Sequence, residues 1–140
     1  MRFLIKALTS AALTVAAVVG VGASPALAAT GYDVYEQNDV GTKHARAWGS
    51  ITWTGARSFN IARANLADLA CDNQPVYWFI DVDGRWTGQE RHMNSGCHTE
   101  TYWTNVHASD SFNIRRITIW VCRDTLFPEC DAKAYSNPNV

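Results

Sequence analysis

Residues 75–84 have the sequence PVYWFIDVDG, and this stretch decides the fold class. Between the proline and the final glycine, successive side chains fall on opposite faces, as they do along a β-strand. One face carries Val76, Trp78, Ile80 and Val82, and the other carries Tyr77, Phe79 and Asp81. Because both faces hold large apolar side chains, we expect 76–82 to be a central strand. Asp83–Gly84 is a strong signal for a hairpin turn directly after it.

The segments on either side of this strand are short, apolar and separated by turn-forming residues. Alternation and aromatic content predict further strands at 32–36, 41–54, 58–70, 85–91, 98–106, 112–122 and 134–136. Arg115–Arg116 interrupts the alternation of its segment, which predicts a β-bulge there. The segment 61–70 also fits a helix, because Leu66 and Leu69 with several alanines could share one helical face.

The predicted fold class is therefore all-β, an antiparallel β-sandwich of about seven or eight short strands. A small closed β-barrel is one alternative, and an α+β fold is another if 61–70 is helical. The chain has 140 residues and no visible linker or repeat, so we expect a single domain.

The first 28 residues have the pattern of a secretory signal peptide. Arg2 and Lys6 supply a basic start, residues 7–22 carry no charge, and Ala26-Leu27-Ala28 supplies a cleavage site of small residues. We expect cleavage after Ala28, with Ala29 as the alternative position. The apolar run of about 16 residues is shorter than the roughly 20 that an uncleaved membrane anchor needs. The sequence therefore predicts a secreted, extracellular domain at 29–140.

All four cysteines, Cys71, Cys97, Cys122 and Cys130, lie in that expected domain. An even number of cysteines in an exported chain predicts two disulfides. We favour Cys71–Cys97 with Cys122–Cys130, because the second pair closes a short turn after a strand. The sequence has no Cys-x-x-Cys pair and its histidines are scattered, so the spacing does not support a zinc site. We expect no metal and no cofactor.

The charge balance of residues 29–140 bears on the partner. This part of the chain holds 10 basic and 13 acidic residues, a formal charge of −3. An acid excess argues against electrostatic binding to nucleic acid or to a membrane surface. We therefore expect an extracellular glycan or protein as the partner. The sequence leaves the oligomeric state open.

Aromatic residues near predicted turns, or on a polar strand face, are the candidate ligand-binding residues. They are Trp86, Trp103, Tyr102 and Trp48. Flat exposed rings stack on the apolar faces of sugars and also form hot spots in protein interfaces. The same rings could instead pack inside the sheets, since aromatic side chains are common in strands.

An acidic cluster offers a weak candidate for calcium. Asp81, Asp83 and Glu90 have the spacing of the second half of an EF-hand loop, but Phe79 stands where the first ligand should be. A plain Asp–Gly hairpin turn is the simpler interpretation of the segment.

A second cluster suggests acid–base chemistry. His98 and Glu100 are two residues apart in a predicted strand, so they share a face. With Arg115 or Arg116 nearby, such a set could cleave a phosphodiester bond. An ordinary polar edge face is the alternative interpretation.

The chain resembles small exported proteins of actinobacteria that have no assigned function. The resemblance rests on the Ala-rich signal that ends in Ala26-Leu27-Ala28, on Leu69–Asn73, on Val121–Asp124 with Cys130, and on Asn137–Pro138. It implies a secreted, disulfide-stabilised β domain. The size, the two bridges and Asp83–Gly88 are also similar to the secreted subtilisin-inhibitor group, although the cysteine spacing differs. That similarity implies an inhibitor of an exported enzyme.

The sequence favours a secreted, non-enzymatic binding protein whose ligand is a polysaccharide, cell-wall material or a protein surface. One alternative is an inhibitor or antagonistic protein acting on an exported enzyme or a competing cell. Another is a small hydrolase or ribonuclease that uses His98 and Glu100.

Overall fold

The computed structural model describes residues 27–140, so the predicted signal peptide lies outside the described residues except for its last two positions. Within 27–140 the regular structure consists of strands, and no helix there could cross a membrane. The nine strands of this part are β1 (Ala28–Gln37), β2 (Lys43–Gly55), β3 (Ser58–Asp68), β4 (Val76–Val82), β5 (Trp86–Thr87), β6 (Arg91–Met93), β7 (Thr99–Ser109), β8 (Arg116–Arg123) and β9 (Glu129–Ser136).

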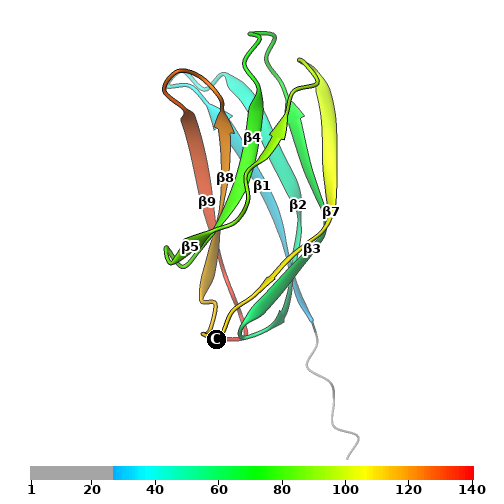
Figure 1. Ribbon diagram of the computed structural model, residues 1–140, viewed down its shortest axis with the longest axis vertical. Helices are drawn as coiled ribbons and strands as arrows, with labels where there is room; N and C mark the ends of the chain where they lie inside the picture. Colours follow the sequence, from blue (N-terminus) through cyan, green and yellow to red (C-terminus); the bar gives the residue numbers. More distant parts are fainter. Residues whose placement is uncertain (1–26) are drawn as a thin grey trace, which may run out of the picture.

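These strands form two antiparallel sheets that pack against each other as a sandwich (Figure 1). The four-stranded sheet has the order β1-β2-β3-β7. The five-stranded sheet has the order β5-β4-β8-β9, and β6 also pairs with β4. The predicted antiparallel sandwich is confirmed. The closed barrel and the helix at 61–70 are excluded.

The segment quoted first is the central strand of the second sheet, with the bounds that the sequence predicts. β4 pairs with β8 on one side and with β5 and β6 on the other. Its inward residues, Val76, Trp78, Ile80 and Val82, are all buried. Trp78 and Trp53 of the opposite sheet are the largest fully buried side chains. After β4, Asp83 and Gly84 both have positive φ, as a tight hairpin turn with a twist matching the strands requires.

The ambiguous segment after Ser58 forms strand β3 because of its neighbours. β2 pairs with it on one side and β7 on the other, so both of its edges are hydrogen-bonded. Phe59, Ile61, Ala64 and Leu66 are buried in the core. A helix here would leave the facing edges of β2 and β7 without partners, and long-range pairing therefore overrides local propensity.

Several predicted strands differ from the structure in their bounds; β1, for example, is longer than the predicted 32–36 and begins at Ala28. The return segment 85–91 is not one strand. Asp81 pairs with Thr87 and Trp78 pairs with Arg91. Between these pairs, two residues of β4 (79–80) face three residues of the return segment (88–90). The one extra residue splits the return segment into β5 and β6. The last strand begins earlier than expected, at Glu129, because it pairs along the whole of β8.

The predicted bulge at Arg115–Arg116 is also wrong. β8 begins only at Arg116, and it pairs with β4 without a register shift. The backbone amides of Arg115 and Arg116 donate to the side chain of Asp83, at 3.1 and 2.8 Å. The Asp83 carboxylate therefore accepts the backbone amides that a carbonyl of a neighbouring strand would otherwise accept.

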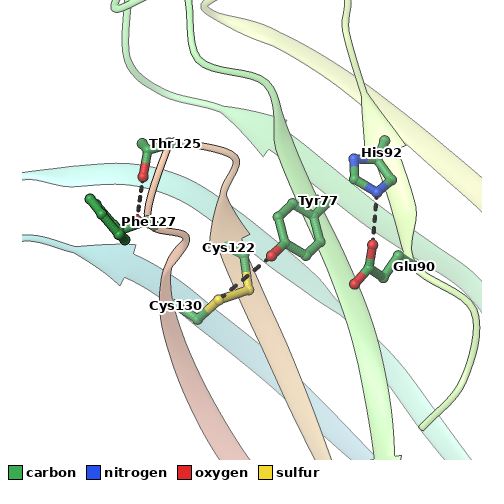
Figure 2. Close-up of a disulfide and its surroundings, with 7 residues drawn as sticks. All are labelled: Tyr77, Glu90, His92, Cys122, Thr125, Phe127 and Cys130. Carbon is green, nitrogen blue, oxygen red and sulfur yellow. Dashed lines mark hydrogen bonds and ion pairs between the residues drawn. A yellow bond between two sulfur atoms is a disulfide. The ribbon is translucent and has the colours of Figure 1, made fainter.

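The disulfides join Cys71 to Cys97 and Cys122 to Cys130, which confirms the expected pairing. The first extends the β3–β7 pair beyond its last residues, Asp68 and Thr99. The second joins directly opposite residues of β8 and β9, and Tyr77 of β4 lies beside it (Figure 2). Two disulfides are consistent with an oxidising environment.

Candidate functional site

The structure divides the four candidate aromatic residues between two environments. Trp86 and Trp103 are partly buried and pack against the core. The ring centroid of Trp103 lies 6.0 Å from that of Trp78. Trp48 and Tyr102 instead project from the outer face of the four-stranded sheet, and Tyr102 is 54% exposed. Only this second pair is placed to meet a large ligand.

Strand register brings Trp48 and Tyr102 into one row across the sheet. Asp33 of β1 stands opposite Trp48, Trp48 opposite Asn65, and Asn65 opposite Tyr102. Neighbouring strands lie about 4.8 Å apart, so two strand spacings of roughly 10 Å separate the two aromatic positions. The amide of Asn65 sits between them and donates to the backbone carbonyl of Trp48 at 3.0 Å.

Cationic side chains lie over the rings of this row. The Arg46 guanidinium is 4.7 Å from the centroid of Trp48 and 5.2 Å from that of Tyr35. The Arg63 guanidinium is 4.0 Å from the centroid of Tyr102, and its Nε donates to Asn65 at 2.9 Å. Such cation–π contacts contribute about 0.5–1 kcal/mol at exposed sites. They hold the rings and the guanidinium planes in a defined arrangement.

Arg46 is further fixed by an ion pair. Its Nε and Nη2 donate to the two carboxylate oxygens of Asp33 at 2.8 and 3.0 Å. This bidentate contact holds the pKa of the Asp33 carboxyl below its ordinary value and raises that of Arg46. We call this surface the platform, and it consists of Tyr35, Arg46, Trp48, Arg63, Asn65 and Tyr102.

Sequence reasoning identified two of these six residues and missed the others. Tyr35, Arg46, Arg63 and Asn65 come from three strands, and their proximity depends on the register of β1, β2 and β3. Alternation does predict that Arg46 and Trp48 share a face of one strand. It does not predict which residue of the next strand lies beside them.

A second candidate surface is a shallow cleft at one end of the sandwich, with a volume of about 1070 Å³. Turns and strand ends from both sheets form it. We call it the arginine cleft. Its lining residues are Arg57, Asp83, Arg85, Ser111, Phe112, Asn113, Arg115, Arg116 and Ser136.

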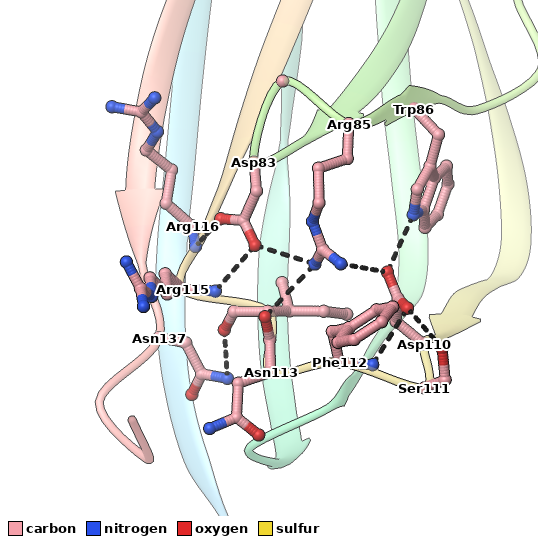
Figure 3. A network of polar contacts seen from close by, with 12 residues as sticks. Asp83, Arg85, Trp86, Asp110, Ser111, Phe112, Asn113, Arg115, Arg116 and Asn137 are labelled. Carbon is pink, nitrogen blue, oxygen red and sulfur yellow. Dashed lines mark hydrogen bonds and ion pairs between the residues drawn. The ribbon is translucent and has the colours of Figure 1, made fainter.

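Acidic side chains hold the wall of the arginine cleft in place (Figure 3). The Arg85 guanidinium donates to Asp83 at 2.9 Å, pairs with Asp110 at 3.1 Å, and donates to the backbone carbonyl of Asn113 at 3.1 Å. Asp110 also accepts hydrogen bonds from the indole of Trp86 and from the amide of Phe112. These contacts, above all the indole hydrogen bond, hold the pKa of Asp110 below its ordinary value.

Asp83 has the same stabilising role. Burial raises the pKa of its carboxyl, but hydrogen bonds from the amides of Arg115 and Arg116 and from Arg85 outweigh burial. The pKa of Asp83 is therefore held below its ordinary value of 3.8. A lowered pKa in the folded state means that the charged carboxylate stabilises the fold. This stabilisation is complete above about pH 4 and is lost as the pH falls through the folded-state pKa.

Replacing Asp83 by asparagine is expected to lower the free energy of unfolding by about 1–3 kcal/mol at neutral pH, because three donors lose a charged acceptor. The loss relative to wild type should be smaller in a second measurement at a pH below 3.8, because the wild-type carboxyl takes up a proton as the pH falls toward its lowered folded-state pKa. Urea unfolding at both pH values measures it. D39N is the control, since the exposed Asp39 carboxylate has no hydrogen-bond partner within 27–140. An equal loss in D83N at both pH values would contradict this role for the charge.

The acidic residues with EF-hand spacing do not converge on one point. Asp81 accepts the amide of Gly84 at 2.8 Å within the turn, and Asp83 faces the arginine cleft. Glu90 lies against His92, at 3.1 Å (Figure 2). The hairpin interpretation is the one that the geometry supports. In residues 27–140, one cluster alone, Cys71, Cys97 and His98, has metal-ligating spacing, and its two sulfur atoms form a disulfide.

The proposed acid–base set is not assembled. His98 directly precedes β7 and Glu100 is the second residue of that strand, whereas Arg115 and Arg116 follow the loop at its far end. An extended strand of 11 residues separates the two ends by about 30 Å. Neither arginine can therefore hold a phosphate beside His98.

Residues 83–88, the segment on which the expected similarity to the subtilisin-inhibitor group rests, form a short hairpin whose side chains are held by hydrogen bonds. Asp83, Arg85 and Trp86 all belong to the hydrogen-bonded wall of the arginine cleft. The amide of Gly88 donates to the carbonyl of Ile80 at 2.7 Å. Comparison of the chain with protein-family models, curated proteins and solved structures gave no match.

Proposed function

We propose that the protein is a secreted, non-enzymatic binding domain that recognises an extracellular polysaccharide through the platform. The observation that carries this proposal is the single row in which Trp48, Asn65 and Tyr102 stand side by side across three strands. Secretion is supported by the signal-peptide pattern of residues 1–28 and by the two disulfides.

The chemistry of the platform suits sugar rings. A pyranose ring has a face of C–H groups, which packs on an aromatic ring, and a rim of hydroxyl groups, which need donors and acceptors. Arg46, Arg63 and Asn65 supply planar donors next to the rings, and Asn65 and Asp33 supply acceptors. These groups are already fixed by contacts with one another, which reduces the conformational entropy lost on binding.

The rest of the same face favours a glycan over a protein partner. All five aliphatic Val, Leu and Ile side chains of the four strands are buried in the core, namely Val34, Ile51, Ile61, Leu66 and Val106. The outward residues near the platform are mostly small and polar, such as Ser50, Thr52 and Thr104. The centre of a stable protein interface is more apolar than this.

Binding to insoluble glycans tests the proposal. The secreted domain is incubated with cellulose, chitin and peptidoglycan, and the bound fraction is measured as a function of protein concentration. We expect retention on at least one of them, and a loss of up to about tenfold in affinity for W48A and for Y102A, since packing on one aromatic ring contributes roughly 0.5–1.5 kcal/mol.

The matched control is W120A, which removes a half-exposed tryptophan from the outer face of the other sheet. It should bind as the wild type does. No retention on any of the three glycans, with no change in tryptophan fluorescence on adding soluble fragments of them, would overturn the proposal. So would equal losses in W48A and W120A.

A further inference from the structure

The arginine cleft concentrates positive charge in a domain that is acidic as a whole. Its lining residues include four arginines and one aspartate, a formal charge of +3. Residues 29–140 together carry −3. Four of the domain's 10 basic residues therefore lie at one end of the sandwich, away from the platform on its face.

Asp83 and Asp110 together offset two of the four arginine charges at the cleft. Both oxygens of Asp83 accept backbone amides, and one of them also accepts Arg85. Asp110 likewise accepts hydrogen bonds from the indole of Trp86 and the amide of Phe112, and it forms an ion pair with Arg85. Arg85 is thus a fixed part of the wall, and in the described part of the chain, residues 27–140, the other three arginines have no carboxylate partner.

Arg115 and Arg116 are the free cations of the cleft. Both are exposed, and neither guanidinium has a hydrogen-bond or ion-pair partner within residues 27–140. Figure 3 shows both side chains on the same side of the Asp83 and Arg85 network, opposite Trp86, with their guanidinium groups pointing apart. Arg57 makes one long contact of 3.4 Å, to the carbonyl of Ser111. Ten guanidinium N–H donors of Arg115 and Arg116 are consequently open to a ligand.

We propose that the arginine cleft is a second binding site, for a phosphate-bearing anion, and that Arg115 and Arg116 are its principal ligands. A guanidinium presents paired N–H donors whose geometry matches two oxygens of a phosphate. A phosphomonoester carries a charge of about −1.5 to −2 at neutral pH and has three acceptor oxygens. It is therefore a better ligand for a pair of arginines than a carboxylate, which carries a single charge and two oxygens. The site goes beyond glycan binding and does not depend on it.

The exposed ring of Phe112 lies beside this charge and adds an apolar surface. It is 70% exposed, and the Arg85 guanidinium lies 5.7 Å from its centroid. The carbon skeleton that carries the phosphate can pack on this ring while its oxygens face the arginines. A phosphate ester therefore fits the cleft better than a free inorganic ion.

Calorimetric titration of the folded domain with pyrophosphate at low ionic strength tests the site, followed by glycerol 3-phosphate and by tripolyphosphate. We expect saturable binding that weakens with added salt. The R115Q/R116Q variant should bind at least about tenfold more weakly, since two charge contacts are lost. The variant keeps both backbone amides on Asp83, so its fold should be preserved, which its thermal unfolding curve checks.

The control is R46Q/R63Q, which removes the same two charges from the platform and should leave pyrophosphate affinity unchanged. Tighter binding of tripolyphosphate than of pyrophosphate identifies a phosphate chain as the source of the ligand, and tighter binding of glycerol 3-phosphate identifies a phosphate ester. Citrate binding as tightly as pyrophosphate would overturn the assignment to phosphate. Equal binding by wild type and R115Q/R116Q would overturn the site, and neither result bears on glycan binding.

Discussion

Replacing Trp78 by alanine is expected to lower the free energy of unfolding by about 3–5 kcal/mol, the range for removing a large aromatic side chain from a packed core. Trp78 is fully buried, at the middle of β4. It contacts Trp103 from the opposite sheet, and the Arg91 guanidinium lies 5.1 Å from its ring. Its removal opens a cavity between the two sheets that neighbouring strands cannot fill. Equilibrium unfolding in urea, followed by far-ultraviolet circular dichroism, measures the loss.

Two further variants separate packing from other causes. W48A makes the same substitution on the outer face and should cost about 1 kcal/mol or less, since it removes one exposed cation–π contact. W78F should cost about 1 kcal/mol, because the indole Nε1 of Trp78 has no hydrogen-bond partner within residues 27–140. A W78A loss no larger than that of W48A would show that the tryptophan does not join the two sheets.

The same tryptophan shows why the fold class could be predicted from sequence. Alternation along 76–82 depends only on neighbouring residues of one chain segment, and it places Trp78 on one face with Val76, Ile80 and Val82. The Asp83–Gly84 turn is equally local. The split of the return strand into β5 and β6 depends on one extra residue opposite β4, which no local pattern marks.

The candidate sites were harder to predict because they depend on long-range placement. Trp86 looked like an exposed turn residue. Its indole N–H instead donates to Asp110, which is 24 residues away in sequence, and its ring packs against the core. Arg115 and Arg116 looked like an irregularity within a strand, but β8 begins at Arg116 and both backbone amides donate to the side chain of Asp83. In each case a polar contact between distant turns decides the position.

Loss of the Cys71–Cys97 bridge is expected to lower the free energy of unfolding by about 3.5 kcal/mol, against about 2.5 kcal/mol for Cys122–Cys130. The difference arises because the first bridge closes a loop of sequence separation 26 and the second one of 8. A longer closed loop restricts the unfolded chain more. Cys71–Cys97 also encloses three strands of the five-stranded sheet, β4, β5 and β6, in the loop that it closes.

Each bridge is measured in a variant that keeps only that one, C122A/C130A for Cys71–Cys97 and C71A/C97A for Cys122–Cys130. The stability of each variant is compared with and without reductant, so that any cavity left by alanine at the buried Cys122 position cancels. If the unfolded chain is what the bridges restrict, C122A/C130A loses about 1 kcal/mol more on reduction than C71A/C97A does. The opposite order would mean that the direct cross-strand link between β8 and β9 stabilises the native sheet, because loop length alone cannot produce it.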